Sequence, residues 1–309
     1  MDIAPFHAAL AEGDTASAHW ITTSDGVRLR IAVWPKGENG TVLLFPGRTE
    51  YVEKYGRAAQ DFAQRGFATL AIDWRGQGLA DRLIKDTALG HIDRFLDYQK
   101  DVAAALAAAQ ALDLPKPYYL VAHSMGGAIG LRALLDGLDV KAVAFSAPMW
   151  GILMSPVMRP VAWGLSFCAR KAGLGHLRTM GTKRETYVKA EPFAGNMLTS
   201  DQDMFDYMAR QIRGAPDLAL GGPTFAWLNE ALKETRTILA APAPNLPCYT
   251  ALGTGERIVD PTSVHAKMGS WPNGELTLVD GAEHEIMMET PPRRAAFFDG
   301  AAALFLANR

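Results

Sequence analysis

A strand-like run that stops at a serine constrains the fold of this chain more than any other feature. Residues 117–123, Pro-Tyr-Tyr-Leu-Val-Ala-His, have the composition of a buried strand, Ser124 follows, and residues 128–135 begin a helix. A serine on so tight a turn tolerates only small residues two positions before and after it, where Ala122 and Gly126 stand. The usual pattern has glycine in place of Ala122. The prediction of the turn therefore rests mainly on the strand before Ser124 and the helix after it. The sequence predicts a nucleophile elbow with Ser124 as the attacking group.

A serine hydroxyl needs a general base, and that base needs a carboxylate to orient it. In chains with this elbow the order is serine, acid, histidine, and only His265 and His284 lie in the last part of the sequence. His284 ends the run 276–284, just after a predicted strand, where a loop can deliver it to the serine. His265 lies within residues 261–268, a predicted helix start, where a surface or helix-packing role is expected. We therefore predict His284 as the base.

Two carboxylates compete for the role of the acid. Residues 248–253 read as a buried strand, and the loop after it contains Glu256 and Asp260. Glu256 is favoured because it lies in the first turn after the strand, from which this kind of site usually presents its acid. Asp260 precedes Pro261 and a helical pattern, so it is expected to cap that helix, but the sequence leaves both carboxylates open.

Acyl transfer also needs two N–H groups aimed at the developing oxyanion. Met125 supplies one because it follows the serine. The second is expected after an early strand, and residues 41–45 form a buried-strand pattern that ends in Pro46, Gly47 and Arg48. We predict the backbone N–H of Arg48 as the second donor. Its side chain is either a cation near the mouth of the site or a solvated surface arginine.

Strand and helix patterns alternate along much of the chain, with strands expected at 21–23, 28–34, 41–45, 68–72 and 141–146 and helices at 54–65 and 95–112. This alternation predicts an α/β fold with a mainly parallel sheet and helices on both faces. It breaks at about residue 148 and resumes after the proline-rich residues 241–247. We therefore expect a core domain from residues 1–147 and 241–309 and an inserted helical cap at 148–240.

Five stretches carry a resemblance to a known family: residues 45–55 (Phe-Pro-Gly-Arg-Thr-Glu-Tyr-Val-Glu-Lys-Tyr), 71–78 (Ala-Ile-Asp-Trp-Arg-Gly-Gln-Gly), 122–127, 253–260 and 281–284. Together they resemble α/β-hydrolases of the group that contains monoacylglycerol lipases, bacterial lysophospholipases and serine aminopeptidases. Monoacylglycerol lipases carry His-Gly where this chain has Pro46-Gly47, and usually aspartate where it has Glu256. The chain is therefore more similar to the lysophospholipase branch.

The resemblance implies a serine hydrolase that cleaves esters of single-chain lipids through an acyl-enzyme, with no metal or organic cofactor. The alternatives are an aminopeptidase or small-ester carboxylesterase on the same site, and a binding protein that has kept the fold without catalysis. The resemblance also implies that Asp73 is a structural loop residue. His123, next to the serine, is expected to pack or to line the pocket.

The expected cap is rich in methionine and in basic residues. Its methionines either line an acyl-chain site or fill the cap's own core: Met149, Met154, Met158, Met180, Met197, Met204 and Met208. Residues 170–189 hold six cations against one carboxylate, Glu185, which could favour an anionic membrane surface or simply form a solvated basic face.

Charge and composition indicate which other partners the protein is expected to lack and where it is expected to be located. The net charge of −2 and the absence of a basic tract argue against nucleic acid, and the two cysteines have no metal-ligand spacing. No secretory signal is visible, so a cytoplasmic location is expected, with possible contact at the inner face of the membrane. The oligomeric state is not determined by the sequence.

Overall fold

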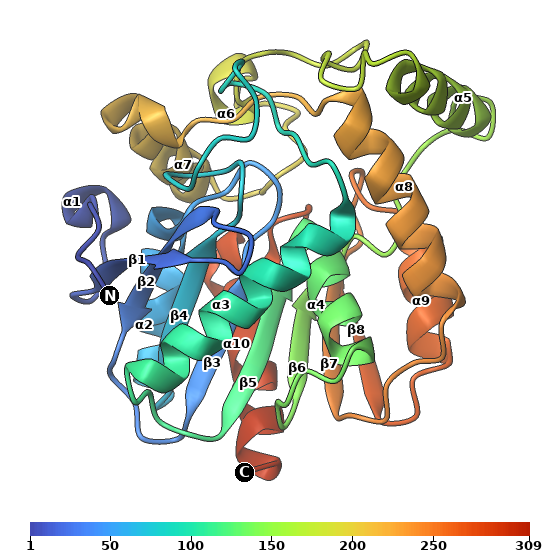
Figure 1. Cartoon of the computed structure of the whole chain (residues 1–309). Coiled ribbons are helices and arrows are strands. Elements are labelled where there is room, and N and C mark those ends of the chain that lie inside the picture. The colour runs from blue at the N-terminus through green and yellow to red at the C-terminus, as the bar shows by residue number, and fades with distance from the viewer.

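The computed structural model describes all 309 residues and contains one eight-stranded sheet in the order β1-β2-β4-β3-β5-β6-β7-β8 (Figure 1). Strand β2 runs antiparallel to both β1 and β4, and the other neighbours pair in parallel. The predicted α/β fold is confirmed. The strands are β1 (Ser17–Thr22), β2 (Arg28–Trp34), β3 (Thr41–Phe45), β4 (Ala68–Asp73), β5 (Tyr118–His123), β6 (Val143–Ser146), β7 (Cys248–Gly253) and β8 (Gly274–Val279).

Helices cover both faces of the sheet (Figure 1). Alternate side chains of the fully buried strand β5 enter different cores: Leu120 and Ala122 join one, while Tyr119 and Val121 join the other. The first core is covered by α3 (Tyr98–Ala111), α4 (Met125–Leu135), α8 (Phe225–Ala240) and α9 (Pro261–Gly269). The second is covered by α2 (Gly56–Gln64) and α10 (Pro291–Ala307).

The chain between β6 and β7 forms helices and contains no strand. Most of it lies over the carboxyl ends of the parallel strands, at the top of Figure 1, while α8 runs from there down beside the sheet. Its helices are α5 (Met158–Lys171), α6 (Tyr187–Ala190), α7 (Gln202–Gly214), the short η3 (Pro216–Leu218) and α8. Side-chain caps fix two of the helix starts, because Asp201 accepts from the N–H of Met204 at 2.9 Å and Thr224 from the N–H of Trp227 at 3.3 Å. These caps set where α7 and α8 begin above the sheet.

Shorter elements complete the chain. They are α1 (Ala8–Ala11), η1 (Val52–Tyr55), η2 (Phe95–Asp97) and η4 (Ile286–Met288). The predicted helices at 54–65 and 95–112 therefore each begin with a tighter turn, η1 before α2 and η2 before α3.

Asp73 at the end of β4 anchors the segment that follows β3. Its carboxylate accepts from the N–H groups of Val52 and Leu79, both at 2.8 Å, and from Arg30 Nε at 2.7 Å. Arg30 is fully buried and also pairs with Glu53 at 2.7 Å. Asp73 thus connects strand β2 to the segments that contain Val52 and Leu79, as a structural residue would. It also fixes the start of η1 close to the site described next.

Candidate active site

Ser124 stands at the sharp turn between β5 and α4. Its backbone has φ 50° and ψ −119°, a left-handed conformation that is costly for a residue with a side chain and is held by the packing around it. The turn presses against the end of β3, because a Cβ atom on Gly126 would lie 2.1 Å from the carbonyl oxygen of Phe45. Ala122 is fully buried in the core below. The local geometry is that of the expected elbow.

His284 is bonded to Glu256, which follows β7. Nδ1 of His284 lies 2.7 Å from Oε2 of Glu256, and the second carboxylate oxygen accepts from the N–H groups of Ile258 at 2.6 Å and Val259 at 3.0 Å. Burial alone would raise the pKa of Glu256, but His284 and the two N–H donors hold it below its usual value. Because this carboxylate can only accept, Nδ1 of His284 carries the proton and Nε2 is left to accept one.

Asp260 and His265, the alternative acid and histidine, have other roles in the structure. Asp260 caps α9 by accepting from the N–H of Thr262 and the hydroxyl of Ser263, both at 3.1 Å, and it has no contact with His284. His265 is exposed on α9. Of the two carboxylates that the sequence left open, the structure brings Glu256 to His284, while the catalytic role of this pair stays a prediction.

The two residues expected to donate to the oxyanion, Arg48 and Met125, follow the ends of two neighbouring strands. Phe45 of β3 pairs with Ala122 of β5, so Arg48 and Ser124 lie just beyond the ends of adjacent strands. Met125 opens α4, so its N–H has no carbonyl one turn earlier in the helix. The loop around Arg48 is held on both sides, because the N–H of Thr49 donates to Gln77 at 3.1 Å and Gln77 donates to the carbonyl of Gly47 at 3.0 Å. The N–H of Arg48 itself donates to no protein group.

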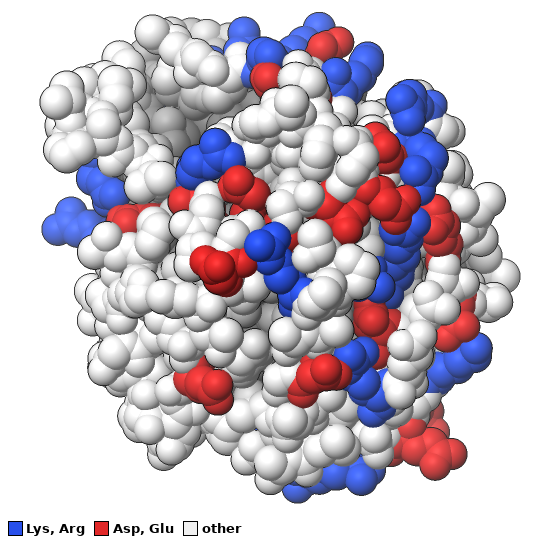
Figure 2. Space-filling view, turned by 180° about the vertical axis from the view of Figure 1, so that it is seen from behind, with Lys and Arg blue, Asp and Glu red and all other residues white.

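A cavity of about 620 Å³ lies between the sheet and the helical segment, and Ser124 and His284 both line it. Hydrophobic residues make up 17 of its 29 lining residues, and the volume is typical of small-molecule sites. A hollow with mainly uncharged borders is visible at the upper left of Figure 2. Five of the seven methionines of the segment line the cavity, namely Met149, Met154, Met158, Met180 and Met208. The methionines therefore serve mainly the cavity, and only Met197 and Met204 do not line it.

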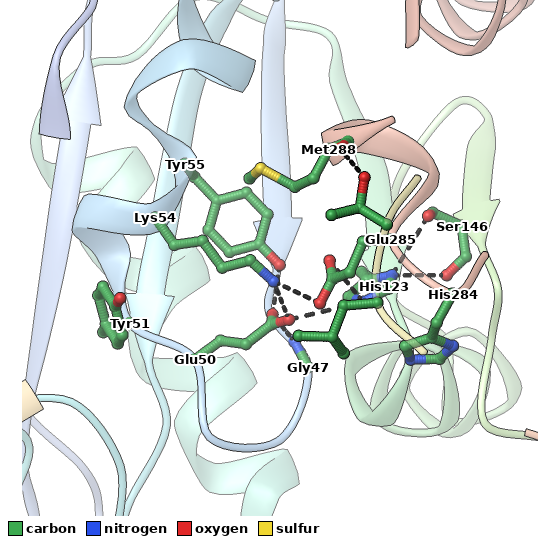
Figure 3. Close-up of polar contacts among 12 residues, drawn as sticks. Gly47, Glu50, Tyr51, Lys54, Tyr55, His123, Ser146, His284, Glu285 and Met288 are labelled. Atoms are coloured by element: carbon green, nitrogen blue, oxygen red, sulfur yellow. Dashed lines mark hydrogen bonds and ion pairs between the residues drawn. The ribbon is translucent and has the colours of Figure 1, made fainter. Parts of the chain in front are cut away.

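Behind His284 lies a group of charged residues that we call the buried ion cluster: Glu50, Lys54, His123 and Glu285 (Figure 3). Nζ of Lys54 contacts Glu50 at 2.5 Å and Glu285 at 2.6 Å. Nε2 of His123 lies 3.1 Å from Glu285, and the ring of His123 is 4.8 Å from that of His284, centre to centre. The cluster therefore connects the residue before the serine to the residue after the histidine.

The residues of the buried ion cluster shift one another's pKa values. Burial by itself would lower the pKa of Lys54 and of His123, but Glu285 and Glu50 outweigh it and raise both. Burial would raise the pKa of Glu285, but His123 and Lys54 hold it well below its usual value. The charged forms of these buried groups therefore stabilise one another.

Glu50, His123 and Glu285 are also the one group of side chains in the structure that could ligate a metal ion, with ligand atoms within 4.8 Å of one another. The ammonium group of Lys54 bonds both carboxylates, so the cluster has its own cation. His123 was expected to pack or line the pocket; it packs within this cluster and does not line the cavity. No pattern in the sequence indicated that Glu50, Lys54 and Glu285 meet beside the site, although Glu285 adjoins His284 in the chain.

Comparison with known proteins identifies the family. A profile of the family described as "Serine aminopeptidase, S33" matches residues 37–291. The chain belongs to this family of α/β-hydrolases. This S33 protein is accordingly a serine hydrolase of the α/β-hydrolase family.

Relatives of this S33 hydrolase include lipid-cleaving enzymes. It is 33% identical to lysophospholipase L2 of Escherichia coli (strain K12), over 82% of this chain and 76% of the relative. It is 28% identical to a probable lysophospholipase L2 of Haemophilus influenzae, over 80% of this chain and 78% of that one. A soluble variant of monoglyceride lipase from Saccharomyces cerevisiae has the same fold, with a TM-score of 0.74, 20% identity and 98% of each chain covered.

The basic stretch at 170–189 of the S33 hydrolase is less charged than its sequence indicates. Carboxylates from elsewhere reach it, because Arg170 pairs with Glu230 of α8 and Arg184 pairs with Asp86 at 2.8 Å. Within the stretch and just beyond it, Lys183 pairs with Glu191 at 2.6 Å and Lys189 with Glu185 at 3.5 Å. The expectation that Glu185 alone opposes these cations is wrong, since distant residues fold against them. None of the helices is long and apolar enough to span a membrane.

Proposed function

We propose that this hydrolase cleaves the carboxylic ester of single-chain lipids, lysophospholipids or monoacylglycerols, through an acyl-enzyme. The observation that carries the proposal is the methionine-lined apolar cavity into which both Ser124 and His284 open. Flexible, polarisable methionine side chains suit an acyl chain, which has no polar groups to recognise. The names of the two lysophospholipase relatives agree with this choice.

In the proposed reaction the hydroxyl of Ser124 attacks the ester carbonyl while Nε2 of His284 takes its proton. Glu256 holds Nδ1–H of His284 and stabilises the ring while it is positively charged. The N–H groups of Arg48 and Met125 bind the oxyanion. His284 then gives the proton to the leaving alcohol, and water, activated by the same ring, releases the fatty acid from Ser124.

We further propose that residues 148–240 act as a cap that meets lipid surfaces. Large apolar side chains are exposed on and around α5, with Val157 74% and Met180 76% exposed. The full set is Leu153, Val157, Met158, Val161, Leu165, Phe167, Leu174, Leu177 and Met180. Because much of the nearby positive charge is paired, we expect apolar insertion to contribute more than attraction to anionic lipids. With the predicted cytoplasmic location, the surface would be the inner face of the membrane.

An aminopeptidase on the same site would need a free carboxylate for the substrate ammonium group. The carboxylates of the helical segment that could serve do not line the cavity: Glu185, Glu191, Asp201, Asp203 and Asp206. Glu50 and Glu285 do line it, but both are paired with Lys54. The structure therefore favours a lipid ester over an amino-terminal peptide.

The test is a hydrolysis panel on purified protein with Ser124→Ala as the control. It compares lysophospholipids, monoacylglycerols, short p-nitrophenyl esters and aminoacyl amides. Preference for the long single-chain lipids, lost in Ser124→Ala, would support the proposal. Turnover of aminoacyl amides or short esters alone would replace it with the aminopeptidase or carboxylesterase alternative. Silence on the whole panel would leave a different substrate or a binding role.

A further inference from the structure

The guanidinium group of Arg48 is an unusual feature of the cavity wall. The sequence left it open whether this side chain is a solvated surface arginine, and in the structure it is half-buried on the cavity wall. Arg48 lines the cavity, donates from one nitrogen to the carbonyl of Gly221 at 2.8 Å, and lies 5.5 Å from the ring centre of Trp227. No carboxylate forms an ion pair with it, and burial lowers the pKa of Arg48 to about 10.

Arg48 is half-buried, and an unpaired cation there is costly because burial removes part of the water that stabilises its charge. The side chain remains protonated at neutral pH, and of its five N–H donors only one is used by the protein. The remaining donors are available to a group in the cavity. Trp227 stabilises the positive charge through its ring but offers no counter-charge.

The other charges of the cavity are already matched. Lys54, the second basic lining residue, bonds both Glu50 and Glu285. Arg48 is thus the charged basic residue of the cavity wall that has no carboxylate partner in the protein. A ligand that supplies an anion here would remove the cost of burying the charge, whereas a neutral ligand would leave it in place.

We infer that the guanidinium group of Arg48 binds the phosphate of a lysophospholipid whose ester lies at Ser124. The inference rests on the proposed function and selects lysophospholipid over monoacylglycerol. Arg48 and Ser124 follow β3 and β5, which are adjacent strands. Adjacent strands in a sheet lie about 5 Å apart. In a glycerol-based lysophospholipid the phosphate is separated from the ester by the short glycerol unit, which suits a long side chain anchored beside the serine. The planar fork of an arginine also matches two phosphate oxygens.

The test measures binding of ligands that cannot be cleaved, so it does not depend on turnover. The probes are two short-chain ethers used below their micelle concentrations, an alkyl ether lysophosphatidylglycerol and the matching alkylglycerol, with inorganic phosphate as a third. Wild type is compared with Arg48→Met, with the charge-retaining Arg48→Lys, and with Arg236→Met. Arg236 is a matched control because it is exposed on α8, has no ion pair and does not line the cavity.

The wild type should bind the phosphate ether at least about tenfold more tightly than the alkylglycerol. Arg48→Met should remove this preference, Arg48→Lys should keep part of it, and Arg236→Met should keep all of it. A purely structural role, through the bond to Gly221, would weaken both ethers equally in Arg48→Met and would overturn the inference. Equal binding of the two ethers by wild type would also overturn it, whatever the fold of the variants.

The remaining outcomes separate the inference from the proposed function. If wild type binds neither ether, the lipid site itself is refuted and the inference falls with it. If both ethers bind without preference, the lipid site stands and only the role of Arg48 is refuted. Inorganic phosphate that binds as tightly as the phosphate ether would refute the lipid as the source of the phosphate.

Discussion

A glutamine at position 256 would be held in one orientation by two backbone N–H groups. The carboxylate oxygen that now accepts from Ile258 and Val259 would have to remain an oxygen, since an NH₂ group cannot accept from either donor. The amide NH₂ would then face Nδ1 of His284, which lies 2.7 Å from the other oxygen of Glu256. Nδ1 would become the acceptor and the ring proton would move to Nε2. In that tautomer Nε2 cannot take the proton of Ser124.

This change should lower kcat by about 10⁴-fold, or about 5 kcal/mol of transition-state stabilisation, as in other triads whose acid becomes an amide. The matched control is Asp260→Asn. Asparagine is as good a helix cap as aspartate. The only ion pair lost is with the partly exposed Arg159 at 3.3 Å, worth at most about 1 kcal/mol. The kcat of Asp260→Asn should therefore stay close to that of wild type.

The assay is the rate of inactivation by a fluorophosphonate, which reports the reactivity of Ser124 whatever the natural substrate is, together with p-nitrophenyl ester turnover. Circular dichroism and thermal unfolding confirm that each variant folds. The reasoning is refuted if folded Glu256→Gln keeps more than about a tenth of wild-type reactivity, or if Asp260→Asn loses as much.

Three further predictions concern the elbow and the buried ion cluster. Gly126→Ala should destabilise the protein by about 3 kcal/mol or more in urea unfolding, because its Cβ would lie 2.1 Å from the carbonyl oxygen of Phe45; an unchanged midpoint would contradict this. Lys54→Met should cost about 3–5 kcal/mol by the same measurement, since Glu50 and Glu285 would be left buried without their cation, and a loss below about 1 kcal/mol would mean that water reaches the cluster. Because Glu285 and Glu50 raise the pKa of His123 despite Lys54 and burial, its stabilising effect should be full below about pH 6.5 and lost as pH rises through the folded-state pKa. The difference in unfolding free energy between wild type and His123→Asn should thus shrink from pH 6 to pH 9, and a constant difference would show that His123 does not titrate in this way.

The sequence by itself determined the fold and the positions of the predicted reacting groups, Ser124 and His284. Strand and helix patterns depend on residues a few positions apart, and the elbow depends on small residues two positions from Ser124, so both are visible without the fold. His284 followed from chain order and from its place after a strand. The bounds of β3 matched the predicted strand at 41–45, and β5 ended at the residue before Ser124 as expected.

Only the tertiary structure decided which charged groups meet. Lys54 and Glu285 are 231 residues apart in the chain, Arg48 and Gly221 are 173 apart, and Glu256 and His284 are 28 apart. Ion pairs depend on distances of a few ångströms between side chains, and no local pattern encodes these when the partners belong to different strands and loops. The same reason explains why the stretch at 170–189 reads as basic in sequence and is largely neutralised in the fold. Local sterics and periodicity therefore indicated the scaffold and the predicted nucleophile, while folding alone paired Glu256 with His284 and left the charge of Arg48 unpaired.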